Sequence, residues 1–334
     1  MTAAEDVEWV AVEDRSAPGH VRRAATALAE RLGFGEARRS EVGVAATELA
    51  TNLHRHAVAG TVAIRIRRAG TEAGLQLVVV DSGPGIADLG VAMVDGHSTA
   101  GTLGVGLGAV RRLASRYDAF SVVDRGTVMV ATFWASTPPA EPDTVEALTR
   151  PIRGETVCGD ACAWRVEGDV TVVMLADGLG HGPLAALASQ RAIQAFRTMP
   201  STEPAEILGL LNPPLAATRG AAVSVARIDA GRGTVRFAGI GNVAGWIDDG
   251  DKRRQMVCFP GIVGQNRKKT IRQLDYEVPP DGLVVLHSDG LTGKWTLDDY
   301  PTIRRRDRLV IAASLLRDAG VRHDDASVVV AGAA

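Results

Sequence analysis

The stretch Asp81-Ser82-Gly83-Pro84-Gly85 decides the fold of the first half of this chain. It directly follows Leu75 to Val80, a branched aliphatic run that predicts a buried strand. An aspartate at the end of such a strand is placed to accept a hydrogen bond from an exocyclic amine, and the flanking glycines permit close approach of a ligand. Taken alone, Ser-Gly-Pro-Gly is equally typical of a β-turn.

Three alternate glycines, Gly104, Gly106 and Gly108, precede the segment from Arg111 to Tyr117, which we predict to be helical. Free backbone N–H groups at the start of a helix are suited to binding phosphate. A single glycine triplet is a weak signal for nucleotide binding, so its meaning depends on the neighbouring motifs.

A helix predicted from Glu36 to His56 places Glu48 and Asn52, four residues apart, on one face. A carboxylate and an amide oxygen in this arrangement suit Mg²⁺ that is shared with substrate phosphates. By itself, a polar pair at this spacing more often marks a solvent-exposed face.

The first half also contains a second amphipathic helix and several short strands, which predict helices packed on one face of a mostly antiparallel sheet. The expected helix runs from His20 to Leu32. The expected strands are Thr61 to Arg67, Leu75 to Val80, Phe120 to Val123 and Val128 to Phe133.

In the second half, acidic residues follow or precede apolar strands. Asp177-Gly178 comes after Val170 to Ala176, Asp289-Gly290 comes after Leu283 to His287, and Asp324-Asp325 precedes the last strand. Carboxylates gathered from strand ends repel one another unless cations lie between them, and oxygen ligands suit Mg²⁺ or Mn²⁺. Any one Asp-Gly pair is first of all a turn signal.

Strands dominate this half, with two helical stretches between them, so we expect an α/β sandwich. The remaining predicted strands are Ala221 to Ile228, Thr234 to Ala238, Val243 to Ile247 and Ser327 to Val330, and the helices are Leu184 to Phe196 and Asp307 to Ala319. The fold class is therefore α+β. We place the first domain at 1–135, a proline-rich linker at 136–150 and the second domain at 151–334.

Bulk properties restrict the partners. The 334 residues carry a net charge of −2, with 46% apolar and 23% charged residues, which argues against nucleic acid as a partner. No apolar run reaches membrane-spanning length, and the acidic residues 1–6 lead into no apolar segment typical of a signal peptide. We therefore expect a cytoplasmic protein with no membrane partner. Three cysteines do not suit a disulfide framework. Zinc bound by Cys158 and Cys162 is a weak alternative.

Taken in order, the motifs of the first half resemble the complete set of the GHKL ATPase and kinase superfamily, and most closely the RsbT-type serine/threonine kinases. The motif residues are Glu48, Asn52, Asp81, Gly83, Gly85, Gly104, Gly106, Gly108 and the Gly126-Thr127 pair. Residues 92–99 resemble the ATP lid of that family. The resemblance implies a Bergerat-type α/β sandwich that binds ATP, with Asn52 on Mg²⁺, Asp81 on the adenine amine and Glu48 as the catalytic base.

The ordered motifs of the second half resemble the PP2C-type phosphatases of the SpoIIE and RsbX group. They are Gly159-Asp160, Asp177-Gly178, Gly241-Asn242, Ser288-Asp289-Gly290 and Asp324-Asp325. The resemblance implies two Mn²⁺ or Mg²⁺ ions held by Asp160, Asp177, the Gly178 carbonyl, Asp289 and Asp324, with a metal-activated water as nucleophile. His181 is either a general acid or, in the interpretation we favour, a loop residue bonded to the backbone.

Together the two resemblances imply a bifunctional partner-switching regulator, with protein kinase and protein phosphatase activities in bacterial stress or sigma-factor control. The implied partners are STAS-domain proteins, meaning anti-sigma antagonists or stressosome components, and also a sigma factor or anti-sigma factor. The alternative is a phosphatase regulated by a non-catalytic domain that senses ATP or binds partners as an anti-sigma factor does.

Overall fold

The computed structural model describes residues 2–3, 5–69, 72–93, 106–137, 144–265, 270–321 and 323–333. It divides into two compact units. One comprises residues 1–4, 143–299 and 318–334, and the other comprises residues 5–142 and 300–317. After the families that their sequences resemble, we call the first of these the phosphatase unit and the second the ATPase unit.

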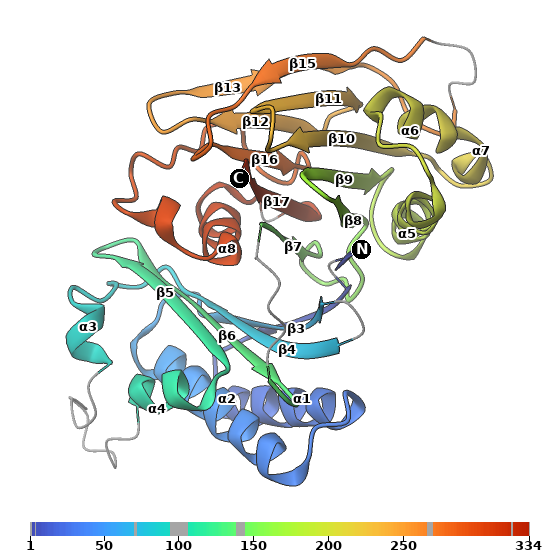
Figure 1. Ribbon diagram of the computed structural model, residues 1–334. Helices are drawn as coiled ribbons and strands as arrows, with labels where there is room; N and C mark the ends of the chain where they lie inside the picture. The colour runs from blue at the N-terminus through green and yellow to red at the C-terminus, as the bar shows by residue number, and fades with distance from the viewer. Residues whose placement is uncertain are drawn as a thin grey trace. The chain divides into compact units, whose positions relative to one another are not determined.

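The ATPase unit is built on a five-stranded antiparallel sheet in the order β2-β3-β4-β6-β5. Three helices, α1, α2 and α4, cover one face of this sheet (Figure 1). The strands are β2 (Glu5–Ala11), β3 (Thr61–Ala69), β4 (Glu72–Val80), β5 (Arg116–Val122) and β6 (Gly126–Trp134). The helices are α1 (Ala17–Arg31), α2 (Glu36–His56), α3 (Leu89–Ala92) and α4 (Gly106–Leu113).

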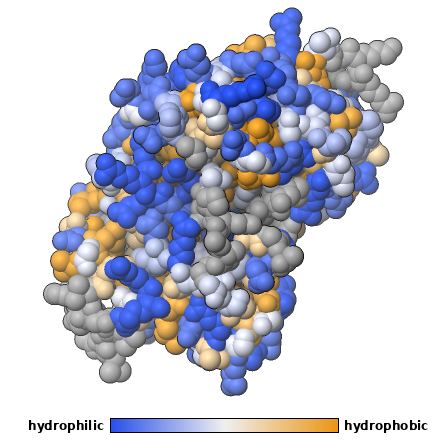
Figure 2. Space-filling view, viewed as in Figure 1, coloured by the Kyte–Doolittle hydropathy of each residue, from blue (hydrophilic) through white to orange (hydrophobic). Residues whose placement is uncertain are grey.

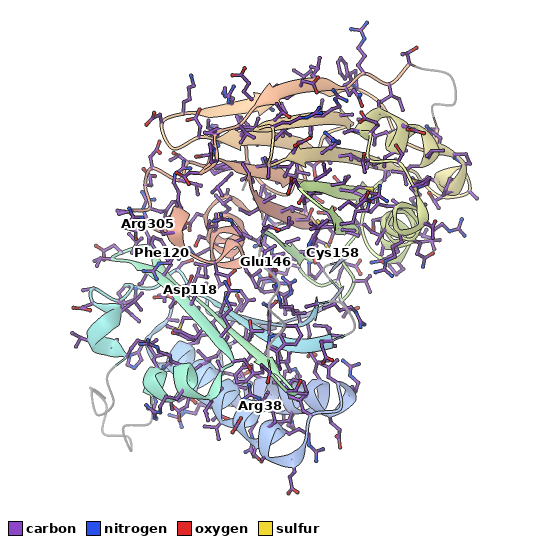
Figure 3. The ribbon with its side chains drawn as sticks, viewed as in Figure 1. Arg38, Asp118, Phe120, Glu146, Cys158 and Arg305 are labelled. Atoms are coloured by element: carbon purple, nitrogen blue, oxygen red, sulfur yellow. The ribbon has the colours of Figure 1, made fainter. Side chains whose placement is uncertain are left out.

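Alternate side chains of the strands form part of the core of the ATPase unit. Val62, Ile64, Leu75 and Leu77 are buried against apolar residues of the helices, because successive side chains of a strand point to opposite faces. Arg38 of α2 ties the layers together (Figure 3). Its guanidinium donates to the carbonyl oxygens of Trp134 and Leu113, at 3.0 and 2.6 Å.

The phosphatase unit is a sandwich of two sheets. One sheet has the order β1-β8-β9-β10-β11-β14, with β15 also paired to β11, and the other has the order β13-β12-β16-β17-β7. The strands are β1 (Thr2–Ala3), β7 (Val145–Arg150), β8 (Asp160–Glu167), β9 (Val170–Gly178), β10 (Ala221–Asp229), β11 (Thr234–Ile240), β12 (Ala244–Asp248), β13 (Arg253–Met256), β14 (Cys258–Phe259), β15 (Leu274–Glu277), β16 (Leu283–His287) and β17 (Ala326–Gly332).

Side chains from the two sheets share one apolar core, to which Val173, Leu175, Val284 and Val329 belong. The helices α5 (Pro183–Thr198), α6 (Pro204–Leu210) and α7 (Asn212–Leu215) cover the outer face of the larger sheet, around a second core.

On the face of the molecule that Figure 2 shows, exposed side chains are mostly hydrophilic, with smaller apolar patches between them. Among the described residues, no helix is long and apolar enough to cross a membrane.

The α+β class and its two sandwiches are confirmed, but several elements differ from expectation. The second half of the expected linker is strand β7, which pairs with β17. Residues Thr2 and Ala3, expected in the first domain, pair with β8 of the phosphatase unit. The helix predicted from Arg111 to Tyr117 begins at Gly106 and ends at Leu113, because Arg116 and Tyr117 already pair with β6.

The last helix, α8 (Arg308–Ala319), follows a short 3₁₀ turn, η1 (Ile303–Arg305). Most of it belongs to the ATPase unit, although it comes late in the chain. Asp118 of β5 accepts hydrogen bonds from the Arg306 guanidinium at 3.2 Å and the Asp307 amide at 2.7 Å. The rings of Phe120 and Tyr300 meet edge to face, with centroids 6.2 Å apart.

Candidate functional sites

Acidic residues meet at one edge of the phosphatase sandwich. Asp160, the first residue of β8, lies opposite Asp177 near the end of β9. Asp289 follows β16, while Asp324 precedes β17, and these two strands are antiparallel neighbours. The charges of Asp160, Asp289 and Asp324 all act on Asp177. The fold therefore brings together four acids that the sequence predicted as one site.

Burial and mutual repulsion disfavour ionisation of these acids. Burial raises the pKa of Asp160, whose side chain is 4% exposed. The nearby Ser288 and Ser327 hydroxyls oppose this rise, yet neither carboxylate oxygen of Asp160 has a hydrogen-bond partner of good geometry. Burial, followed by the negative charges of its three neighbours, also raises the pKa of Asp177.

The acids fit a divalent cation by their chemistry. Two carboxylate oxygens of Asp160 are buried without partners, and oxygen atoms are the ligands that Mg²⁺ and Mn²⁺ prefer. Among the residues described, no three His, Cys, Asp or Glu side chains already stand in ion-binding geometry.

Two residues support this site in ways that the sequence analysis did not assign. The Asn242 amide donates a hydrogen bond to Asp289. Asp325 accepts hydrogen bonds from the Ile152 and Gly159 amides at 2.8 and 3.0 Å, so it holds the loop that leads into β8. Both residues lie in the quoted motifs, but their hydrogen bonds connect segments that are far apart in the sequence.

Neither His181 nor a zinc-binding pair of cysteines is part of this site. The His181 side chain is 61% exposed, and its Nδ1 atom lies 3.3 Å from Glu155. The structure thus gives His181 a carboxylate neighbour instead of the expected bond to the backbone. Cys158 and Cys162 are free thiols, and no zinc-binding group exists among the residues that the structure describes.

In the ATPase unit, Asp81 lies at the end of β4 and is 8% exposed. Its Oδ1 atom accepts the Gly83 amide at 2.7 Å, and its own amide donates to the Thr127 carbonyl at 3.0 Å. Burial is the largest influence on Asp81 and raises its pKa, while bonds from Gly83 and Thr127 oppose that rise. Asp81 and Thr127, predicted from separate motifs, therefore lie side by side.

Glycines allow close contacts around Asp81. A Cβ atom on Gly126, which has a φ of +96°, would lie 2.0 Å from the Asp81 carbonyl oxygen. A Cβ atom on Gly85, with a φ of +72°, would lie 2.3 Å from the Val122 carbonyl oxygen. Gly106 and Gly108 lie in the first turn of α4. Gly104 and most of the predicted lid, residues 94–99, lie outside the described residues.

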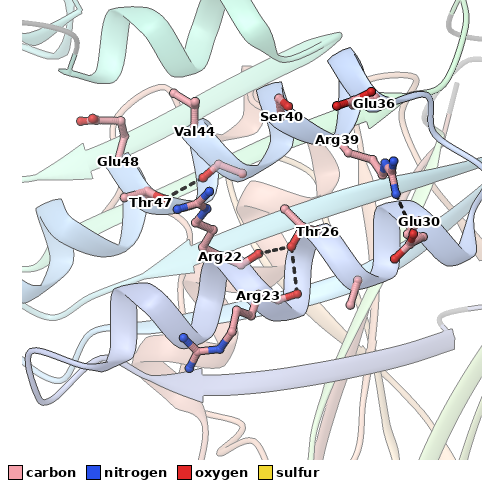
Figure 4. Close-up of a pocket in the computed structure, with 12 residues that line it drawn as sticks. Arg22, Arg23, Thr26, Glu30, Glu36, Arg39, Ser40, Val44, Thr47 and Glu48 are labelled. Atoms are coloured by element: carbon pink, nitrogen blue, oxygen red, sulfur yellow. Dashed lines mark hydrogen bonds and ion pairs between the residues drawn. The ribbon is translucent and has the colours of Figure 1, made fainter.

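Glu48 and Asn52 lie on α2, as predicted, and both are half-buried. Glu48 lines an open groove of about 700 Å³ between α1 and α2 (Figure 4). Charged residues surround this groove, and Arg39 pairs with Glu30 at 2.7 Å within it. Glu48 is therefore accessible from the outside of the helical layer.

Each half of the chain matches a known protein family. Residues 11–133 match the histidine kinase-like ATPase domain family, and residues 167–333 match the stage II sporulation protein E (SpoIIE) family. Serine/threonine-protein kinase RsbT of Bacillus subtilis (strain 168) is 37% identical over 107 residues, which are 32% of this chain and 80% of RsbT.

Two solved structures are similar as well. A chain from a structural study of the bacterial stressosome is 30% identical with a TM-score of 0.52, and the match covers 56% of this chain and 98% of that one. RsbX in complex with magnesium is 21% identical with a TM-score of 0.47, covering 57% and 96% of the two chains.

This chain therefore belongs to the SpoIIE family of PP2C-type phosphatases, and it carries an RsbT-like ATPase domain of the histidine kinase-like type in front of the phosphatase domain. It is an enzyme with a protein serine/threonine phosphatase domain and a protein kinase-type domain in a single polypeptide.

Proposed function

We propose that this protein is a bifunctional partner-switching regulator, which phosphorylates and dephosphorylates serine or threonine in a small STAS-domain protein. The observation that carries the proposal is the pairing in one chain of the Asp160, Asp177, Asp289 and Asp324 cluster with the Asp81 and Thr127 site. The similarity to RsbT, and to a chain from a study of the bacterial stressosome, supports an anti-sigma antagonist or stressosome protein as the partner, in sigma-factor or stress control.

In the phosphatase reaction, Asp177, Asp289 and Asp324 would hold Mg²⁺ or Mn²⁺, together with the Gly178 carbonyl and Asp160. Such ions supply an acidic water that is a nucleophile at neutral pH. Asn242 orients Asp289 through its amide. Asp325 keeps the loop before Asp160 in place, which preserves the geometry that the acids require.

In the kinase reaction, the Asp81 carboxylate would accept the adenine amine, with Thr127 beside it and Gly83, Gly85 and the α4 glycines allowing close approach. Asn52 would hold Mg²⁺ next to the phosphates. Glu48 would take the proton from the substrate hydroxyl, and the open groove in front of it leaves room for a protein substrate. Positioning and charge neutralisation are the main demands of phosphoryl transfer.

Incubation with a STAS protein tests both activities. With ATP and Mg²⁺, we expect Glu48→Gln to reduce phosphorylation at least about 100-fold, while Glu36→Gln, on the same helix and groove, leaves it near the wild-type rate. With phosphorylated STAS protein and Mn²⁺, we expect Asp177→Asn to reduce dephosphorylation at least about 100-fold. Unchanged phosphorylation in Glu48→Gln would remove the kinase assignment.

One observation favours a second role, in which the ATPase unit senses ATP and controls the phosphatase. Arg317 of α8, within the SpoIIE-family match, donates to the Asp81 carbonyl at 3.4 Å. A segment of the SpoIIE-family match thus contacts the expected nucleotide site within the ATPase unit. Phosphatase activity of Glu48→Gln that changes on ATP addition, without any phosphorylation, would support this role.

A further inference from the structure

The phosphatase unit contains an apolar pocket of about 250 Å³. Its wall is formed by Ile240 at the end of β11, Phe259 of β14, and Ile262, Val263 and Ile271 from the following segments. This volume is below the roughly 300–1,000 Å³ typical of small-molecule sites. The pocket is therefore suited to a single large side chain.

The pocket lies close to the acidic cluster. Ile240 comes two residues before Asn242, which contacts Asp289. Val263 and Ala221 exchange two backbone hydrogen bonds of 3.1 and 2.9 Å, and Ala221 lies opposite Gly178 in the β9–β10 pair. Because neighbouring strands are about 4.8 Å apart, the pocket wall is about 10 Å from Gly178.

Arg219 places a positive charge near the loop that follows Asp177, and its neighbour Gly220 contacts the pocket wall. The Arg219 guanidinium rests against the loop that follows Asp177, since a Cβ atom on Gly180 would be 2.8 Å from its Nη1 atom. Across the described part of the chain, no acidic side chain pairs with Arg219. The next residue, Gly220, packs against Ile262, because a Cβ atom there would lie 2.6 Å from Ile262 Cγ2.

We propose that the phosphatase recognises an extended segment of its phosphoprotein substrate through these two features. Arg219 contacts the phosphate, for which a guanidinium offers paired donors. The pocket takes an aliphatic side chain about three residues from the phosphorylated serine or threonine, because an extended chain rises about 3.3 Å per residue. This inference rests on the proposed phosphatase function.

Charge complementarity favours a phosphorylated segment over other occupants. Arg272 lies at the rim of the same pocket, with its guanidinium 5.9 Å from the Phe259 ring centroid. Two arginines flanking an apolar pocket match a segment that carries both a phosphate and an aliphatic side chain. The apolar face of a second copy of this chain would leave both charges without a counterpart.

Phosphopeptides test the pocket in the full-length protein with Mn²⁺. Three peptides share one phosphoserine and carry leucine three residues before it, leucine three residues after it, or alanine at both places. We expect kcat/KM to be about tenfold higher for one leucine peptide than for the alanine peptide, mainly through KM. Ile271→Ser should bring this ratio close to one, whereas Leu274→Ser, an exposed position outside the pocket, should keep it.

A separate measurement tests the role of Arg219. We expect Arg219→Ala to raise KM for all three peptides about tenfold, with Arg219→Lys recovering part of the loss and the leucine preference intact. If thermal unfolding shows that Ile271→Ser does not fold, Ile262→Ser provides the same comparison.

Equal kcat/KM for the three peptides in the wild type would overturn the pocket assignment, as would a leucine preference that survives Ile271→Ser. A dimer that Ile271→Ser dissociates would assign the pocket to a second copy and overturn it too. Failure to hydrolyse both the peptides and p-nitrophenyl phosphate would instead refute the phosphatase function itself.

Discussion

At the scale of single residues, the acids of the phosphatase site oppose folding when no cation is bound. Asp160 is buried without a hydrogen-bond partner of good geometry, and Asp177 is half-buried among three like charges. Such groups are retained for binding and catalysis rather than for stability. The same carboxylates that would hold a cation therefore destabilise the metal-free protein.

The raised pKa of Asp160 predicts how the stability of the metal-free protein depends on pH. Because the folded-state pKa of Asp160 is raised above its ordinary value of 3.8, the folded metal-free protein binds this proton more tightly than the unfolded chain does. The resulting stabilisation is fully present below the ordinary carboxyl pKa and is lost as pH rises through the raised pKa. The free energy of unfolding should therefore fall from acidic towards alkaline pH.

The variant Asp160→Asn removes this ionisation. In chelator at pH 8, we expect it to raise the free energy of unfolding by about 2 kcal/mol, with a much smaller gain at pH 5, as measured by urea denaturation. Asp251→Asn, at an exposed carboxylate, should change little at either pH. A loss of stability in Asp160→Asn at both pH values would contradict the expected cost of the buried charge.

At the scale of elements, the nucleotide site depends on how closely the end of β4 approaches the start of β6. Gly126 begins β6 with a φ of +96° and leaves no room for a side chain beside the Asp81 carbonyl. Gly33, which follows α1, has a φ of +77°, but a Cβ atom there would meet none of the described residues within 4 Å. The two glycines differ mainly in the contact that a side chain would make.

Alanine at these two positions separates backbone strain from steric conflict. We expect Gly126→Ala to lower the free energy of unfolding by about 3 kcal/mol and to weaken ATP binding. Gly33→Ala should cost about 1 kcal/mol and leave ATP affinity unchanged. Chemical denaturation and titration calorimetry measure both quantities. Equal destabilisation by the two substitutions would show that the contact with Asp81 does not matter.

At the scale of the whole molecule, the compact units do not follow the order of the chain. Residues 300–317 fall within the SpoIIE-family match but belong to the ATPase unit. The sheet face opposite to α1 and α2 also carries buried side chains. Strand alternation places three of them there, Val78, Val128 and Val130. A fragment cut at the proline-rich segment would therefore lack part of its own unit.

We expect residues 1–137, expressed alone, to aggregate and to bind an apolar fluorescent dye more strongly than the full-length chain at equal molarity. A monomeric fragment without dye binding would show that residues 300–317 are dispensable for this unit.

The variant Asp118→Ala in the full-length chain removes the acceptor of the Arg306 and Asp307 hydrogen bonds. We expect it to lower the free energy of unfolding by about 1 to 3 kcal/mol.

Much of the local structure was predictable because hydrophobic periodicity reports it directly. The helix from Glu36 to His56 matches its prediction at both ends, and the strand from Leu283 to His287 does so too. Short or polar strands were missed, such as β7 in the expected linker. Such a strand is recognisable only from its partner, because pairing and not composition stabilises it.

The sequence by itself determined the α+β class, the two families and the order of their motifs, because these depend on residue types and spacings along the chain. Tertiary structure alone decided that Asp325 holds a loop, that the charge of Asp324 acts on Asp177, and that Asn242 orients Asp289. It also decided that residues 300–317 join the ATPase unit. The physical reason is that hydrogen bonds and burial act between residues close in space, whatever their separation in sequence.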